Sequence, residues 1–262
     1  MIRMTGVLLA GILAASPVVT AGVAPGESMA AVREETEMQA TMSESGPSFD
    51  VEQFVLPEDA GVLVVVEGTG GVDCVVRAYE RSEGVWEQRV ETVGHLGKNG
   101  LSSDRTEGDS TTPVGLFQMN TPFGQAAALD GFPADYIQVD ASYVWEEDSN
   151  RLVKGSTAEG ERVGSEGYAG YYDYVLDFGY NRQAITDKGS ALFLHCEGAD
   201  TSGTHGCVAI PTESMIEVMR LYGACGDDDE HCYIALARQG MFDLVYDSYG
   251  VNDGLSPTGD GF

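Results

Sequence analysis

Basic residues are scarce in this 262-residue chain, which has 14 lysines and arginines against 42 acidic residues and a formal net charge of −28. Its only lysines are Lys98, Lys154 and Lys188. Because nucleic-acid binding needs clustered lysine and arginine side chains, the composition excludes a nucleic-acid-binding protein. So large a charge affects solubility and the choice of partners rather than the fold, and we interpret it as an adaptation to a salty or acidic habitat.

Long hydrophobic runs are also missing. The apolar run near the N-terminus covers residues 7–15, which is short for a membrane-spanning helix. It follows a short segment with one basic residue, Arg3, and leads into small residues that end near Ala21. This order is typical of a secretory signal peptide, so we expect residues 1–21 to be a signal peptide and the protein to be secreted. Membrane attachment would require that the signal is retained.

The rest of the chain predicts a single domain between two loose ends. Residues 22–55 are rich in Glu, Ser, Met, Ala and Gly without a sustained apolar period, which predicts a flexible leader. The folded domain is expected over residues 61–238. Residues 248–262 contain several glycines and a proline, and we expect a loose C-terminal tail there.

Short strands dominate the expected secondary structure. The apolar runs that indicate strands lie at residues 61–66, 72–80, 85–93, 208–210 and 233–237. A helix is expected to open at Pro211 and to end at Gly223. Residues 130–170 show no clear pattern, and we expect an irregular lid or cap there. The fold class is therefore mainly β with one or two helices (α+β).

Five cysteines are present, and an odd number in an exported protein leaves one thiol unpaired. If Cys207 is that thiol, four remain. Cys225 and Cys232 close a short acidic loop, so we expect them to form a disulfide. Cys74 and Cys196 either pair with each other or stay as buried thiols.

The segment of residues 190–210 combines a histidine and a cysteine in a pattern typical of a cysteine enzyme. An apolar run leads into His195, and Cys207 follows the glycine Gly206. A thiol is a poor nucleophile until a nearby imidazole takes its proton. A strand, a loop and a second strand can bring the two side chains together. We therefore expect Cys207 as nucleophile, held as a thiolate, and His195 as proton acceptor and donor.

The residues around the cysteine leave alternatives open. Gly206 permits a sharp turn, so the amides of His205, Gly206 and Cys207 can converge as an oxyanion hole. His205 is an alternative base, because positions 205 and 207 share a face of an extended segment. A zinc site is another alternative, although the usual ligand spacing is missing. Its ligands would come from His195-Cys196, His205 with Cys207, and His231-Cys232.

Together these residues resemble the L,D-transpeptidases, enzymes with a YkuD-type catalytic domain that crosslink bacterial peptidoglycan. The resemblance covers roughly residues 61–238. It is carried by His195, residues 204–207, residues 97–100, residues 107–117 and Tyr180-Asn181. It implies a mainly β YkuD-like fold, peptidoglycan stem peptides as partners, no metal, no cofactor, and a location in the bacterial cell wall or periplasm.

By this resemblance, Cys207 would attack the carbonyl of the third residue of a stem tetrapeptide and release the terminal D-alanine. The acyl group would then pass to an amine of a second stem peptide. With water as the acceptor, the same Cys207–His195 pair would make an L,D-carboxypeptidase or amidase. A non-catalytic wall-binding protein is the third hypothesis.

Two departures from the family pattern affect these expectations. Cys196 stands where a glycine or serine is common, and a disulfide with Cys207 would silence the enzyme. Val208-Ala209 replaces the frequent polar or basic pair after the nucleophile, which bears on the preferred acceptor.

Overall fold

The computed structural model describes residues 46–227 and 230–250. The expected signal peptide, the leader up to residue 45 and the tail from residue 251 lie outside the described residues. The compact unit that carries the fold begins at Pro47, and everything below concerns this unit.

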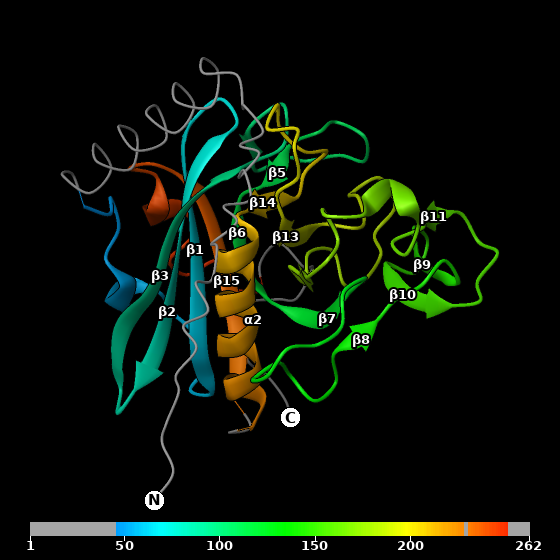
Figure 1. Ribbon diagram of the computed structural model, residues 1–262. Helices are drawn as coiled ribbons and strands as arrows, with labels where there is room; N and C mark the ends of the chain where they lie inside the picture. The colour runs from blue at the N-terminus through cyan, green and yellow to red at the C-terminus, as the bar shows by residue number, and fades with distance from the viewer. Residues whose placement is uncertain (1–45, 228–229, 251–262) are drawn as a thin grey trace, which may run out of the picture. The chain divides into compact units, whose positions relative to one another are not determined.

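A single ten-stranded sheet forms the body of the unit (Figure 1). Its strand order is β6-β15-β1-β2-β3-β14-β13-β12-β7-β8. The strands are β1 (Ala60–Gly70), β2 (Asp73–Ser82), β3 (Val85–His95), β6 (Gly115–Gln118), β7 (Asn120–Gly124), β8 (Ile137–Gln138), β12 (Val175–Asp177), β13 (Phe193–Cys196), β14 (Val208–Ile210) and β15 (His231–Arg238). The predicted mainly β fold is confirmed, and all five strands expected from the sequence are present.

The remaining elements are short, apart from one helix. Among the described residues α2 (Thr212–Asp227) is the single α-helix. The short 3-10 turns are η1 (Val51–Gln53), η2 (Glu166–Tyr168) and η3 (Phe242–Leu244), and β4 (Leu101–Ser102) pairs with β5 (Thr112–Pro113). The helix contacts β1, β3, β13 and β15, so it covers one face of the sheet (Figure 1).

Strand β1 is apolar without interruption because both of its faces are buried. Val62, Val64 and Val66 belong to the core cluster that also contains buried residues of α2. Leu63 and Val65 point to the opposite face and pack in a second cluster. Strands covered on both faces read as continuous apolar runs rather than alternating ones.

The second cluster shows that the folded unit begins earlier than residue 61. Phe49 and Phe54 are buried there with Phe242, and the ring centroids of Phe49 and Phe242 are 4.8 Å apart. The predicted leader over residues 22–55 therefore ended too late, because the aromatic residues in its last part pack on the sheet.

The unit also extends past residue 238. Val245 and Ser248 are buried, and Tyr249 packs its ring 5.2 Å from that of Tyr233. The tail expected over residues 248–262 thus starts too early, since residues 248–250 belong to the folded unit.

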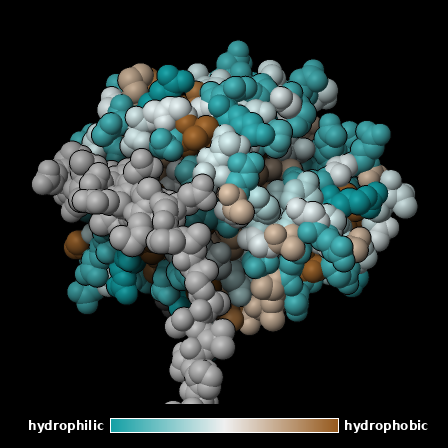
Figure 2. Space-filling view, turned by 45° about the horizontal axis from the view of Figure 1, so that its top comes forward, coloured by the Kyte–Doolittle hydropathy of each residue, from teal (hydrophilic) through white to brown (hydrophobic). Residues whose placement is uncertain are grey.

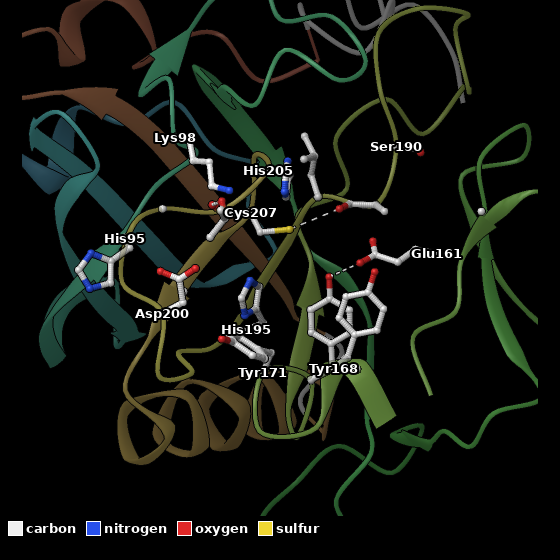
Figure 3. A pocket seen from close by; sticks show the side chains of 18 of the residues that line it. His95, Lys98, Glu161, Tyr168, Tyr171, Ser190, His195, Asp200, His205 and Cys207 are labelled. Carbon is white, nitrogen blue, oxygen red and sulfur yellow. Dashed lines mark hydrogen bonds between the residues drawn. The ribbon is translucent and has the colours of Figure 1, made fainter. Parts of the chain in front are cut away.

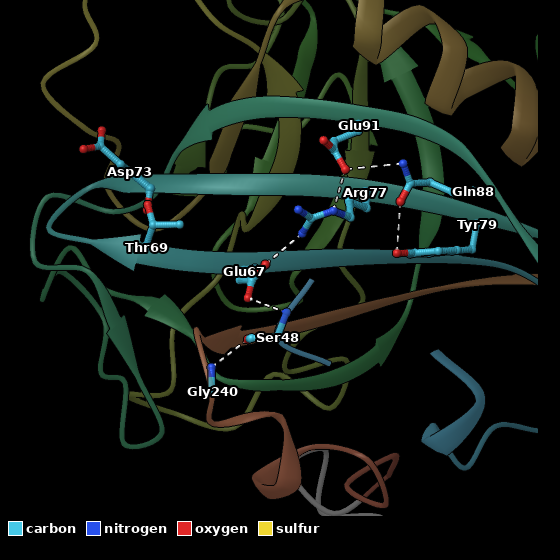
Figure 4. A network of polar contacts seen from close by, with 9 residues as sticks. All are labelled: Ser48, Glu67, Thr69, Asp73, Arg77, Tyr79, Gln88, Glu91 and Gly240. Atoms are coloured by element: carbon cyan, nitrogen blue, oxygen red, sulfur yellow. Dashed lines mark hydrogen bonds and ion pairs between the residues drawn. The ribbon is translucent and has the colours of Figure 1, made fainter. Parts of the chain in front are cut away.

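A buried polar network ties both ends of the unit to the central strands (Figure 4). Arg77 on β2 forms ion pairs with Glu67 on β1 and Glu91 on β3, at 2.8 and 2.7 Å. The second oxygen of Glu67 accepts a hydrogen bond from the Ser48 amide, and the Ser48 hydroxyl accepts one from the Gly240 amide. The network therefore joins the N-terminal and C-terminal segments through the sheet.

Helix α2 opens at the predicted residue but does not end at Gly223. It continues to Asp227. A Cβ at Gly223 would lie 2.5 Å from the carbonyl oxygen of Gly131, so this glycine allows a neighbouring loop to approach the helix. The glycine serves close packing and not helix termination.

The sequence predicts a disulfide between Cys225 and Cys232. Cys225 lies in the last turn of α2 and Cys232 in β15, and both are buried free thiols joined by a hydrogen bond. The predicted Cys225–Cys232 disulfide is thus absent from the structure. Cys74 and Cys196 are buried free thiols as well.

Residues 130–170 are not irregular, contrary to the prediction. They contain a second sheet of three strands, β10 (Arg151–Lys154), β9 (Tyr143–Glu146) and β11 (Gly160–Glu161), in that order. Buried Trp145 anchors it by packing on Phe193, with ring centroids 4.8 Å apart, and by donating to Asn150 at 2.7 Å. We call residues 139–168, which contain this three-stranded sheet, the cap (Figure 1).

The face seen in Figure 2 is mostly hydrophilic, and its apolar residues are scattered. Scattered exposed apolar residues are usual at protein surfaces. None of the helices in the part of the chain that the structure describes has the length and apolar character needed to cross a membrane.

Candidate active site

A pocket of about 540 Å³ opens between the cap and the ends of β13 and β14. His195, His205 and Cys207 all line it, so the structure brings the predicted residues together (Figure 3). The parallel pairing of β13 with β14 sets their spacing, with Leu194 opposite Val208. The strand–loop–strand arrangement inferred from the sequence is therefore present.

The Cys207 thiol is buried and bonded to the main chain. Its Sγ accepts from the Phe193 amide at 3.3 Å and donates to the Ala191 carbonyl at 3.4 Å. Burial raises the pKa of Cys207 to about 12, Glu161 adds to the rise, and the Phe193 amide and Arg105 oppose it. At neutral pH this favours a neutral thiol over the thiolate expected from the sequence.

His195 is neutral for the same physical reason. It is buried on β13, and burial lowers its pKa to about 4, while the main-chain carbonyls of Cys196 and Tyr171 oppose this shift. Its Nδ1 lies 2.7 Å from the Cys196 carbonyl oxygen. A carbonyl can only accept, so Nδ1 carries the proton and Nε2 is the free base. The pair therefore rests as a thiol and a neutral imidazole whose Nε2 carries no proton.

Gly206 has the conformation that a close turn requires. Its φ is +138°, and a Cβ there would lie 2.8 Å from Leu192 Cδ2 and 2.9 Å from the Thr111 carbonyl oxygen. Its amide donates to Thr204 Oγ1 at 3.0 Å, so this amide is not free for an oxyanion. Of the three amides expected in an oxyanion hole, only those of His205 and Cys207 are then left to donate to an oxyanion.

His205 lies on the other side of the turn from His195. Its Nδ1 is 3.2 Å from the Ser110 hydroxyl, and its side chain lines the pocket. This contact ties the turn to the loop before β5, which favours a shaping role over the role of base.

The model of the YkuD L,D-transpeptidase catalytic domain matches residues 73–223, more than half of the 262-residue chain. The chain belongs to this family. A search of curated proteins finds no match.

The fold holds Cys196 away from Cys207. Cys196 lies in the core cluster beneath α2 and donates to the Tyr174 carbonyl at 3.7 Å, while Cys207 belongs to the cluster under the cap. The two thiols thus sit on opposite faces of the sheet, which argues against a disulfide between Cys196 and Cys207 that would silence the enzyme.

The zinc alternative finds no support in the geometry. The described residues contain no group of three or more histidine, cysteine or acidic side chains placed to hold a metal. His231 and Cys232 lie on β15 and line a different pocket from His195, His205 and Cys207.

Buried Arg105, next to the pocket, was not predicted from the sequence. Arg105 donates from Nε to the Thr111 carbonyl at 2.9 Å and from Nη1 to the Lys188 carbonyl at 3.0 Å. Its Nη2 would lie 3.1 Å from a Cβ at Gly206. Arg105 therefore supports the turn that carries Cys207. Its sequence neighbourhood resembles the family, but nothing in the spacing singles out this side chain.

Aromatic and acidic side chains also line the cap side of the pocket. Tyr168, Tyr171 and Tyr172 line the pocket, whereas Tyr174 packs in the core. Glu161 on β11 reaches the same pocket and accepts a hydrogen bond from the Tyr172 hydroxyl at 2.6 Å. No local motif marks Glu161, because its position depends on the three-stranded sheet of the cap.

Proposed function

We propose that this YkuD-domain protein is an exported cysteine acyltransferase that forms peptidoglycan crosslinks by L,D-transpeptidation. The observation that supports this most is the shared pocket of Cys207 and His195, within a domain of the L,D-transpeptidase family. Export agrees with the signal-peptide pattern of residues 1–21, and it would place the enzyme in the cell wall or periplasm.

In the first half-reaction the donor is a stem tetrapeptide. As Cys207 Sγ attacks the carbonyl carbon of the third residue, its proton passes to Nε2 of His195. The amides of His205 and Cys207 donate to the developing oxyanion. His195 then protonates the departing amine, D-alanine leaves, and a thioester on Cys207 remains.

In the second half-reaction an amine of another stem peptide attacks the thioester. A C–N bond forms, the C–S bond breaks, and the thiol is regenerated. Water as the acceptor would give a tripeptide instead, which is the L,D-carboxypeptidase alternative. The two reactions share every residue of the first half and differ only in what reaches the thioester.

The test incubates residues 25–262 with purified disaccharide-tetrapeptide and analyses the products by mass spectrometry, with Cys207→Ala as control. A dimer that has lost one alanine, absent with the variant, is the expected result. Tripeptide without dimer would assign the carboxypeptidase activity. Products that persist in the Cys207→Ala variant would exclude Cys207 as the nucleophile.

A further inference from the structure

Glu161 is a carboxylate that the first half-reaction does not use, although it lies in the pocket of the thiol. Strand β11 holds it by pairing with β9, where Glu161 is opposite Trp145, the buried anchor of the cap. Figure 3 shows Glu161 entering the pocket from the cap side and the Cys207 thiol entering from the sheet side.

Two tyrosines fix the carboxylate. The Tyr172 hydroxyl donates to Oε1 of Glu161 at 2.6 Å. Tyr168 stacks on Tyr172 with ring centroids 4.6 Å apart and an interplanar angle of 5°. Tyr172 in turn packs against the imidazole of His195 at 5.3 Å. The carboxylate therefore has a defined place relative to the catalytic pair.

This arrangement is unfavourable while the pocket is empty. Burial raises the pKa of Glu161, while hydrogen bonds from Tyr172 and Tyr168 and the more distant charge of His205 oppose the rise; the charge of Glu161 also raises the pKa of Cys207. Within the described part of the chain, no lysine, arginine or histidine forms an ion pair with Glu161. A partly buried carboxylate without a cation is costly, and a bound cation would relieve that cost.

The other carboxylates that line the pocket lack this combination. Glu107 is exposed and accepts from the Ser190 amide, and Asp200 is exposed and accepts from the Ser202 amide. Glu147 is exposed on the rim of the cap. Glu161 is the carboxylate that is both partly buried and oriented by tyrosine hydroxyl groups.

We propose that Glu161 binds the ammonium group of the acyl acceptor and takes a proton from it, so that the free amine can attack the thioester on Cys207. This assignment rests on the proposed function and deepens it, since it names the group that favours an amine over water. The acceptor class is a primary aliphatic amine that arrives protonated.

The proton balance of the step is complete. The ammonium gives one proton to the Glu161 carboxylate, and the neutral amine attacks the thioester carbonyl carbon. His195 takes the second nitrogen proton as the C–N bond forms, and returns it to the Cys207 sulfur when the C–S bond breaks. The carboxylic acid of Glu161 then releases its proton to solvent. A carboxyl group with a raised pKa is a stronger base for this transfer than an ordinary one.

The test compares wild type, Glu161→Gln and Glu147→Gln with disaccharide-tetrapeptide, and measures D-alanine, tripeptide and dimer. Glutamine keeps the acceptor oxygen for Tyr172, so the variant preserves the local hydrogen bond. We expect Glu161→Gln to release D-alanine but to lower the dimer-to-tripeptide ratio by about tenfold or more. Glu147→Gln, a carboxylate on the same cap, should leave the ratio unchanged.

A second measurement checks the fold and the proximity without using activity. Loss of the Glu161 charge should speed iodoacetamide labelling of Cys207 at any fixed pH, because that charge raises the pKa of the thiol. Slower labelling would contradict the placement.

Three results would overturn the proposal. The ratio could be unchanged in Glu161→Gln, it could fall equally in Glu147→Gln, or D-alanine release could fall together with the dimer. Absence of D-alanine release by wild type would instead refute the proposed function, and the acceptor assignment with it.

Discussion

Alkylation of Cys207 should depend steeply on pH up to the alkaline limit of the folded protein. Only the thiolate reacts, and burial raises the pKa of this thiol to about 12. Free cysteine, with a pKa of about 8.5, has roughly one thiolate in ten molecules at pH 7.5, whereas a pKa of 12 leaves about three in 100,000. The structure therefore predicts that the resting Cys207 thiol reacts very slowly with an alkylating reagent near neutral pH.

The assay follows iodoacetamide labelling by peptide mapping, which separates Cys207 from the other four cysteines. The rate should rise about tenfold per pH unit from neutral to mildly alkaline pH, without a plateau. The shape of the profile is the readout, because restricted access lowers the rate equally at every pH. His195→Ala should keep the same shape, since a histidine whose pKa is about 4 carries no charge there.

A plateau near or below neutral pH would refute this reasoning. It would mean that the resting site holds a thiolate and an imidazolium, as expected from the sequence alone. A plateau that disappears in His195→Ala would assign the stabilising charge to that histidine.

Three further predictions concern stability and turnover. Arg77→Ala should lower the free energy of unfolding by about 3–5 kcal/mol in a urea titration, because it leaves Glu67 buried without its cation; a loss near zero would show that water enters the network. Trp145→Ala should lower the free energy of unfolding by about 3–5 kcal/mol in the same titration, since it leaves a cavity where the buried indole anchors the cap. An unchanged midpoint would contradict that packing role. Gly206→Ala should lower both the rate of D-alanine release and the melting temperature. The alanine side chain is strained at a φ of +138°, which should destabilise the folded protein by roughly 1–3 kcal/mol. Full activity in that variant would contradict the account of the turn.

Local patterns predicted the parts of the fold that depend on local chemistry. The continuous apolar run of β1 predicted a strand, and Pro211 marked the start of α2. The glycine before Cys207 predicted a close turn, and Gly206 has a positive φ of +138° and close neighbours on its Cα side. Each of these depends on a few neighbouring residues, which the sequence displays directly.

The features that the sequence did not reveal depend on long-range contacts. The cap strands are two to four residues long, too short for a period to be read. Glycine is common at helix ends, which is why Gly223 was expected to end the helix. In the structure it lies inside the helix, where the absence of a side chain lets the backbone at Gly131 approach closely. The pKa of Cys207 follows from burial under the cap, so a local motif suggested a thiolate where the packing gives a thiol.

The most direct test of the central claim is the intact mass of the protein after rapid mixing with a stem tetrapeptide. The account predicts a covalent adduct equal to the tetrapeptide minus D-alanine, located on the peptide that contains Cys207 and absent from Cys207→Ala. D-alanine release without an adduct on Cys207, retained in the variant, would contradict it.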